Sequence, residues 1–469
     1  MTSLTFYGGV NEIGGNKILL EDGDTKIFLD FGMSFKKRAE FFEEFLTPRT
    51  ANGIGDFLAM GLIPDIKGIY REDLLKHAGR QPEEPEIDAV LLSHGHADHT
   101  NYISFLHGNI PIFCGETTLK LLRAIEEQSK RDIESEVINF KKRPLFRADY
   151  RKPPIERIFK TFRTGDKLKI GSLEIEPIHV DHSVPGAYGF IIHTSSGSIV
   201  YTGDLRLHGS NSELTKDFIK VAVEAEPIAM ICEGTRIKET EDKTTEKDVY
   251  ERGKKLLEGK GLSIIDFNFK DVNRFKTFFK IAKELDKKMV ISFKHACYLD
   301  QYSTDEKLNV PHCCGDKNIL IFKPKVGTGT YDDGDYTDEY IKCRLHHPNV
   351  VKADELDKNC MIVLNFWYFN TLVDIKPEKG SLYMHSLSEP FDEEMDISFK
   401  RMMNWLDYFG MNFVQNHCSG HATGLDIKEM VKEINPKILF PIHTEFPGIF
   451  RRFARTKVVK YGKEYDISY

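Results

Sequence analysis

The chain has 469 residues, of which 41% are hydrophobic and 29% are charged, and its formal net charge is −7. A chain of this length and apolar content can bury a sizeable core, and its length predicts roughly two to four domains. The acidic balance excludes a histone-like protein whose overall positive field attracts polyanions. Any nucleic-acid partner must therefore bind in a local groove.

Targeting signals and the spacing of the cysteines indicate where in the cell the protein is expected. The N-terminal stretch MTSLTFYGGVNEIGG lacks the features of a secretory signal, and no stretch approaches the roughly twenty apolar residues of a membrane span. The eight cysteines lack CxxC spacing, which indicates reduced thiols. Their nearest approach to a cluster, His312-Cys313-Cys314, matches no standard zinc finger. We expect a cytoplasmic protein with no membrane partner.

The first half of the chain is predicted to be rich in strands. The helix expected there begins at Glu116 and ends near Asp132, and Ser195, Ser196 and Gly197 form a hairpin turn. Strands are indicated by short apolar runs between glycines, namely TKIFLDFG, IDAVLLS, IPIFCG, SLEIEPIHV, GAYGFIIH and SIVYTGD.

From about residue 236 helices and strands alternate, which predicts a parallel α/β unit. TTEKDVYERGKKLLEG reads as a helix, LSIIDFNF as a strand and DVNRFKTFFKIAKELDKK as a helix that Asp271 can cap. VGTGTYDDGDYTDEY is expected to be a loop. A strand at CMIVLNFW, a helix from about Asp392 to Phe409, the helix DIKEMVKEIN and the strand KILFPI complete the prediction.

The segment HGHADH, directly after the strand ending at Leu92, concentrates groups that bind metals. A loop at the carboxyl edge of a sheet lets short side chains converge, and packing gives His94, His96, Asp98 and His99 little reason to cluster. Imidazole and carboxylate ligands suit zinc, or manganese where oxygen ligands dominate. We therefore predict two adjacent metal sites.

Further ligands must come from other strand ends. His182, Asp204 and His443 each follow an apolar run by a few residues, and a carboxylate such as Asp204 can bridge two cations. His179 competes with His182, because both follow the same strand.

With these residues in place, the chain resembles the metallo-β-lactamase superfamily, whose HxHxDH pattern is His94-Gly95-His96-Ala97-Asp98-His99 here. In this resemblance His182 and Asp204 are the later ligands, and Asp30 in FLDFG orients ligands from behind. The implied fold is a four-layer αββα sandwich with an inserted α/β domain. We expect the first part of the sandwich at residues 1–235, the inserted domain at 236–380 and the second part at 381–469.

Three motifs in the second half resemble those of the β-CASP nucleases: EGTR at 233–236, HCSGHA at 417–422 and PIHTE at 441–445. The segment FNFKDVNRFKTFFKIAKELDKKMVIS resembles the helix and strand that follow the first motif in ribonuclease J. A histidine in the third motif, here His443, is the pattern of members that cleave RNA.

The resemblance implies a two-metal ribonuclease acting on single-stranded RNA, endonucleolytically, from the 5′ end, or both. One ion is expected at His94, His96 and His182 and the other at Asp98, His99 and His443, with Asp204 between them. Asp98 would also orient the attacking water, His421 would be the general acid and Glu233 its partner. Phosphate donors are expected at Ser386, Ser388 and Ser419.

Three alternatives stay open: a β-CASP DNA nuclease, a small-molecule hydrolase of the same fold, and an inactive nucleic-acid-binding subunit. Glu233, His421 and the inserted α/β unit are features that small-molecule hydrolysis does not require. The sequence also leaves open a homo-oligomer and the role of the long segment 33–79, as a lid or a partner surface.

Overall fold

Two compact units make up the chain in the computed structural model, which describes residues 1–43, 45–130, 132–145, 153–239, 244–389 and 393–467. The first unit comprises residues 1–207, 211–242 and 420–469, and the second comprises 208–210 and 243–419. Each unit is described by itself below.

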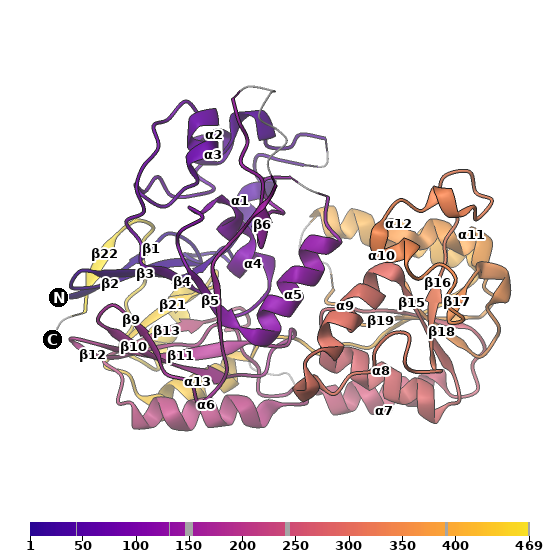
Figure 1. Ribbon diagram of the computed structural model, residues 1–469. Coiled ribbons are helices and arrows are strands. Elements are labelled where there is room, and N and C mark those ends of the chain that lie inside the picture. The colour runs from indigo at the N-terminus through magenta and orange to yellow at the C-terminus, as the bar shows by residue number, and fades with distance from the viewer. Residues whose placement is uncertain (44, 131, 146–152, 240–243, 390–392, 468–469) are drawn as a thin grey trace. The chain divides into compact units, whose positions relative to one another are not determined.

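The first unit contains two large β-sheets and a small one (Figure 1). The order β22-β1-β2-β3-β4-β5-β8 forms one large sheet and β21-β13-β12-β11-β10-β9 the other, while β6 pairs with β7. The strands are β1 (Thr2–Phe6), β2 (Lys17–Asp22), β3 (Thr25–Phe31), β4 (Ala89–Leu91), β5 (Ile112–Gly115), β6 (Asn139–Phe140), β7 (Ile155–Glu156), β8 (Phe159–Phe162), β9 (Leu168–Ile170), β10 (Leu173–His179), β11 (Tyr188–Thr194), β12 (Gly197–Tyr201), β13 (Ala229–Glu233), β21 (Ile438–Ile442) and β22 (Glu464–Asp466).

Helices cover the outer faces of the two large sheets (Figure 1). They are α1 (Phe35–Ala39), α2 (Gly55–Ala59), α3 (Glu72–His77), α4 (Ala97–Thr100), α5 (Glu116–Glu127), α6 (Ser212–Glu224) and α13 (Gly424–Ile434), with shorter 3₁₀ turns η1 (Thr50–Asn52), η2 (Asn101–Phe105) and η8 (Pro447–Arg452).

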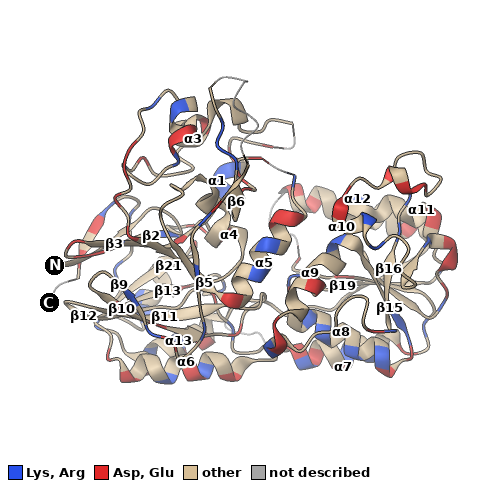
Figure 2. Ribbon diagram, in the orientation of Figure 1, with Lys and Arg blue, Asp and Glu red and all other residues tan. Residues whose placement is uncertain are grey.

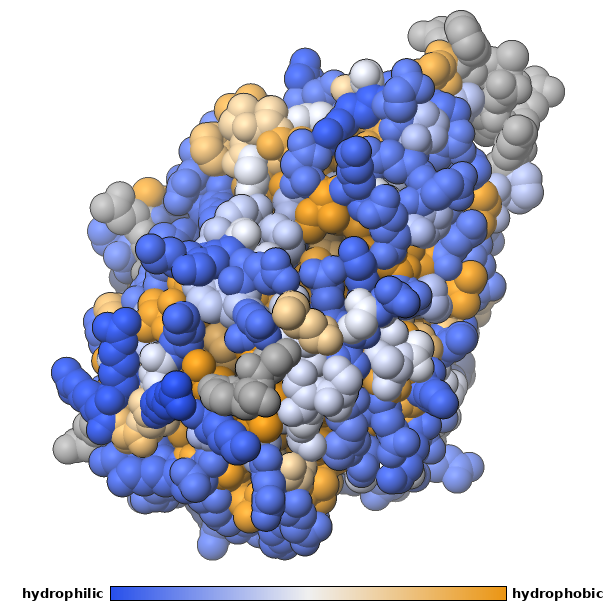
Figure 3. Space-filling model, turned by 90° about the vertical axis from the view of Figure 1, so that its left-hand side faces the viewer, coloured by the Kyte–Doolittle hydropathy of each residue, from blue (hydrophilic) through white to orange (hydrophobic). Residues whose placement is uncertain are grey.

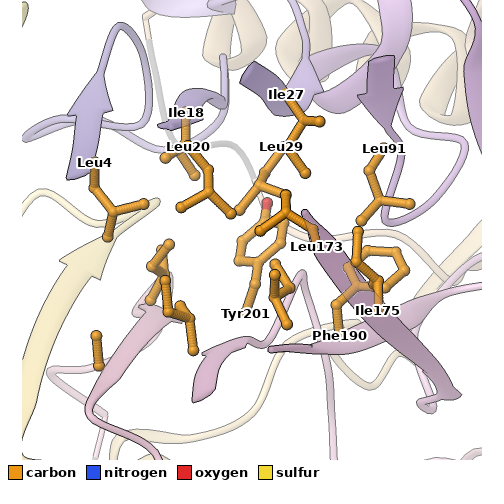
Figure 4. Packing of buried hydrophobic residues seen from close by; sticks show 14 of the residues in the cluster. Leu4, Ile18, Leu20, Ile27, Leu29, Leu91, Leu173, Ile175, Phe190 and Tyr201 are labelled. Carbon is orange, nitrogen blue, oxygen red and sulfur yellow. The ribbon is translucent and has the colours of Figure 1, made fainter. Parts of the chain in front are cut away.

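Three apolar layers hold these elements together. Between the sheets, Leu4 and Leu29 of the first sheet share a core with Leu173 and Phe190 of the second (Figure 4). Alternate residues of the same strands point outward, because successive side chains of a strand lie on opposite faces. Thus Phe28 packs in a separate outer core under the helices. The four-layer αββα sandwich expected from the sequence is confirmed.

The segment 33–79 is part of this packing. Phe57 of α2 and Leu74 of α3 are fully buried against the outer face of the first sheet, in the same core as Phe28 and Val90. Burying an apolar side chain of this size contributes roughly 1.5–3 kcal/mol. The described part of the segment therefore contributes to a structural layer of the sandwich. The sequence had suggested a lid or a partner surface and did not predict this packing role.

The second unit is a seven-stranded parallel sheet with strand order β17-β16-β15-β18-β14-β19-β20. The strands are β14 (Ser263–Asp266), β15 (Lys288–Ser292), β16 (Ile319–Phe322), β17 (Val350–Val351), β18 (Cys360–Val363), β19 (Leu382–His385) and β20 (Asn412–Gln415). The helices are α7 (Glu246–Leu257), α8 (Val272–Glu284), α9 (Phe293–Ser303), α10 (Glu339–Lys342), α11 (Leu372–Ile375) and α12 (Glu393–Phe409), with 3₁₀ turns η4 (Glu306–Leu308), η5 (Asp333–Asp335), η6 (Ala353–Glu355) and η7 (Phe366–Thr371). As expected, Asp271 caps α8 by accepting the N–H groups of Asn273 and Arg274.

The boundaries of the second unit differ from those expected. β19 and β20 pair in parallel with the strands of this unit, so the unit ends at 419 rather than at 380. It begins at 243 rather than at 236, apart from the short stretch 208–210. The strand in KPEKGSLYMHS has the same apolar sequence pattern as the strands of the sandwich. Only its pairing partners show that it belongs to the sheet of the second unit.

The surface agrees with the modest net charge. Acidic and basic residues are interspersed along α6, and also along α7 (Figure 2). On the face shown in Figure 3, hydrophilic residues predominate and apolar ones form small, separate patches. Within the described parts of the chain, none of the helices has the length and apolar character needed to span a membrane.

Candidate metal centre

The HGHADH segment leaves β4 and turns at once into α4. His96 is the N-cap residue of this helix, so Asp98 and His99 lie in its first turn. Asn16 N–H donates to the carbonyl of Asp98 at 3.0 Å, which ties the turn to the first sheet. Gly32 permits this approach, since a Cβ there would lie 1.8 Å from the Asp98 carbonyl oxygen.

The remaining candidate ligands come from one edge of the second sheet. β12, β13 and β21 run parallel to one another, so their carboxyl ends meet at the same edge. Asp204 follows β12, Glu233 ends β13 and His443 follows β21 directly. β10 also runs in this direction, because β11 is antiparallel to both β10 and β12, and it delivers His182.

His94, His96, His182 and Asp204 form one set of potential ligands. His96 Nδ1 lies 3.0 Å from His94 Nε2 and 3.1 Å from His182 Nε2. Asp204 Oδ2 lies 3.7 Å from His94 Nε2 and 3.9 Å from His182 Nε2. The structure thus selects His182 over His179, whose ring instead stacks on Tyr188.

Asp98, His99 and His443 form a second set beside the first. His443 Nε2 lies 3.1 Å from Asp98 Oδ2, and His99 Nε2 lies 3.9 Å from the same oxygen. Asp204 Oδ2 is 3.2 Å from His99 Nε2 and 3.5 Å from His443 Nε2. Asp204 therefore lies between the two sets, as the sequence predicted for a bridging carboxylate.

The chemistry of these donors fits divalent cations. Among the described residues, His99 Nε2 and Asp204 Oδ1 are buried without a hydrogen-bond partner, a costly state for polar atoms. Burial and neighbouring imidazoles lower the pKa of His94 and of His182 well below the usual value, so both rings are neutral and carry a lone pair. Burial opposes charge on Asp204 too, yet His443 and His99 hold the pKa of its carboxyl well below the usual range.

Asp30 supports this centre from behind. Its Oδ2 accepts hydrogen bonds from His99 Nδ1 at 2.7 Å and from the Tyr201 hydroxyl at 2.5 Å. Its Oδ1 accepts Ser93 N–H at 2.7 Å. Since His99 donates through Nδ1, its Nε2 keeps the lone pair on the side of Asp98 and Asp204.

Glu233 and His421 form a pair next to the second set. Glu233 is fully buried, and its carboxylate lies 3.0 Å and 3.2 Å from His421 Nδ1. Burial by itself would lower the pKa of His421, but the charge of Glu233 and its hydrogen bond raise it to about 9. Asp204 Oδ2 is 4.0 Å from the same ring nitrogen.

Thr235 links this pair to His443, which the sequence did not predict. Its hydroxyl donates to Glu233 Oε2 at 2.8 Å, so its oxygen accepts a hydrogen bond from His443 Nδ1–H, also at 2.8 Å. His443 Nε2, which lies 3.1 Å from Asp98 Oδ2, is then the ring nitrogen that faces the candidate metal site. Thr235 is the third residue of the EGTR motif, and this position was the sequence feature from which its role could have been predicted. Ser93 and Tyr201, the partners of Asp30, carried no such signal.

The three serines expected to bind phosphate belong to the second unit. Ser386 is buried and donates its hydroxyl proton to the carbonyl of Asn416 at 2.6 Å, while accepting from Arg274 Nη1 at 2.6 Å. Its hydroxyl is thus committed to the protein. Ser388 is exposed and Ser419 half-buried, and a phosphate role for either stays a prediction.

The chain is similar to known metal-dependent hydrolases. Residues 64–224 match the profile of the β-lactamase superfamily domain, and residues 411–456 match that of the Zn-dependent metallo-hydrolase RNA specificity domain. Ribonuclease J of Mycoplasma genitalium is 23% identical over 465 residues, which span 95% of this chain and 68% of that protein. Ribonuclease J of Pyrococcus abyssi is 22% identical over an alignment of 497 positions, gaps included, which spans 100% of this chain and 96% of that protein.

A solved structure shares the fold. The crystal structure of a protein of unknown function from Enterococcus faecalis V583 superimposes with a TM-score of 0.74 at 23% identity, and the match covers 99% of each chain. The architecture of both units is therefore found in a protein of different sequence.

Thr235→Val should weaken metal binding, because valine keeps the shape of threonine but cannot hold His443 in its ligating tautomer. We expect zinc affinity to fall about 10–100-fold. Thr235→Ser keeps the hydroxyl and should bind nearly as tightly as the wild type. Competition with a chromogenic chelator measures both, and equal affinities for the valine variant and the wild type would refute the role.

Proposed function

Because the chain is a metal-dependent hydrolase of the metallo-β-lactamase superfamily, with ribonuclease J among its relatives, we propose that it hydrolyses RNA phosphodiester bonds with two divalent metal ions. The observation that carries the proposal is the convergence of two ligand sets on Asp204, directly beside the Glu233–His421 pair. Neither element alone specifies a nuclease, but together they supply the groups that cleavage of a phosphodiester requires.

The metal assignment follows the two sets. His94, His96 and His182 would hold one ion and Asp98, His99 and His443 the other, with Asp204 shared. Imidazole and carboxylate donors fit zinc, and also manganese. When bound, such ions supply hydroxide near neutral pH and compensate negative charge on the phosphoryl oxygens.

The chain's own residues orient the reactants and hold the protons. The carboxylate of Asp98, which is partly exposed, accepts a hydrogen bond from the attacking water. His421 Nδ1–H donates to Glu233, which fixes the ring and leaves Nε2 to carry a proton to the leaving oxygen. Glu233 keeps its own orientation because Leu205 N–H and the Thr235 hydroxyl both donate to it.

Two observations support RNA rather than DNA as the substrate. Both His421 and His443 lie within residues 411–456, the region that matches the RNA specificity domain. His443 also fits the pattern of the RNA-cleaving members in the third motif. The proposal further includes a cytoplasmic location, in keeping with eight cysteines that form no disulfide within the described residues. A homo-oligomer stays a prediction.

Replacing a central ligand should remove both metal and activity. His96→Ala takes away the nitrogen that faces His94 and His182, and Asp204→Asn takes away the charge between the two sets. We expect bound zinc, measured by elemental analysis, to fall toward zero and RNA hydrolysis to be abolished. Full activity in either variant would rule out the centre.

Replacing His421 should separate chemistry from metal binding. We expect His421→Ala to slow RNA hydrolysis about a hundredfold or more, because the leaving oxygen loses its proton donor. Metal content should stay normal. His193→Ala is the matched control, since this half-buried histidine pairs with Glu176 on the sheet surface and should keep full activity. A large loss of zinc from His421→Ala would instead assign that residue to metal binding.

The substrate and cleavage mode can be resolved in one assay. Purified protein with zinc is incubated with end-labelled linear RNA, circular RNA and single-stranded DNA of the same sequence. Cleavage of circular RNA would establish endonuclease action, and dependence on a 5′-monophosphate would establish exonuclease action from that end. Hydrolysis of DNA alone would overturn the proposed substrate class.

A further inference from the structure

A second group of metal-binding side chains lies outside the centre described above. Within the described residues of the second unit, His312, Cys313 and Cys314 each offer one ligand atom, and these atoms lie within 4.8 Å of one another. The three residues occupy the loop between η4 and β16.

A tight turn brings the three side chains together. Gly315 N–H donates to the His312 carbonyl at 2.9 Å, which closes the turn. The Sγ atoms of Cys313 and Cys314 are then 3.5 Å apart. Two thiolates on one tetrahedral zinc ion, each at about 2.3 Å, are separated by about 3.8 Å. A small side-chain rotation is therefore enough for both sulfur atoms to reach one ion.

Asp300 of α9 holds the turn in place through hydrogen bonds, as carboxylates next to metal-binding histidines often do. Its Oδ1 accepts Cys313 N–H at 3.2 Å and lies 3.2 Å from His312 Nε2, an ion-pair distance when the ring is protonated. Its Oδ2 accepts the Tyr340 hydroxyl at 2.7 Å and Arg344 Nη2 at 2.8 Å. His312 Nδ1 accepts the Cys314 N–H at 3.2 Å, so the lone pair of this ring is on Nδ1 and points into the turn, where a zinc ion would replace the N–H as its partner.

Simple packing does not account for this group. Cys313 is fully buried and could be an apolar core residue, but Cys314 is half-buried and the His312 side chain is 52% exposed. Two adjacent thiols beside a histidine in a surface loop add little to a core. The His312 ring is therefore in contact with solvent.

We propose that His312, Cys313 and Cys314 bind one zinc ion, distinct from the ions of the nuclease centre. Two thiolates and an imidazole favour zinc over the hard cations magnesium and manganese. The ion would clamp the loop that connects η4 to β16, a structural role.

Cobalt substitution tests this proposal, because none of the proposed ligands of the nuclease centre is a cysteine. The protein is loaded with Co²⁺ and its near-ultraviolet spectrum recorded. We expect a thiolate-to-cobalt charge-transfer band in the wild type and its loss in Cys314→Ser and in Cys313→Ser. The control Cys343→Ser, which changes an exposed cysteine, should keep the band. Zinc content of Cys314→Ser should fall by one equivalent.

Two further variants keep the outcome decisive. His312→Ala changes an exposed side chain, so folding is preserved, and its cobalt affinity should fall about 10–100-fold. His96→Ala should keep the thiolate band even though the nuclease centre is disrupted, which separates this proposal from the proposed function. A wild-type cobalt protein without the band, or a band unchanged in Cys314→Ser, would overturn the site.

Discussion

Several buried imidazole nitrogens face a single carboxylate oxygen, Asp204 Oδ2, at 3.2 to 3.9 Å, and the chemistry of the candidate centre depends on this arrangement. Burial and neighbouring imidazoles lower the pKa of His94 and of His182, and neutral rings this close cannot all donate hydrogen bonds, so their lone pairs repel one another. Burial removes the water that would otherwise relieve this cost. A cation compensates both effects at once, so the same geometry that is unfavourable for an empty protein core becomes favourable for metal binding.

The strand directions of the sandwich make this convergence possible. β12, β13 and β21 end at one edge because they are parallel, and α4 presents Asp98 and His99 from the other sheet. Residues distant in sequence meet there without long side chains, which limits the conformational entropy lost in forming the site. The orienting groups, Asp30 and Thr235, are likewise short and buried or half-buried.

Much of this could be predicted from the sequence, where a local pattern carried the information. The apolar runs predicted the strands, HGHADH indicated four candidate ligands, and the strand ends and the resemblance added His182, Asp204 and His443 as further candidates. The boundary at 419 was missed because β19 and β20 look like any buried strand, and strand pairing is a non-local property. Tyr201 and Ser93 were missed for a similar reason: their role lies in a hydrogen bond to Asp30, which no spacing reveals. The hydroxyl of Ser386 was assigned to a ligand because its hydrogen bonds to Arg274 and Asn416 could not be seen.

The pairing of the chain's ends has a consequence for how the molecule is made. β1 pairs with β22 and β13 pairs with β21, so the first unit is discontinuous and its sheets stay incomplete until β21 and β22 have emerged from the ribosome. Residues 243–419, by contrast, form a nearly continuous unit that can fold earlier during synthesis. His443 arrives last among the residues of the centre. A nascent chain therefore has no assembled centre until β21 has paired with β13 and brought His443 beside Asp98 and Asp204.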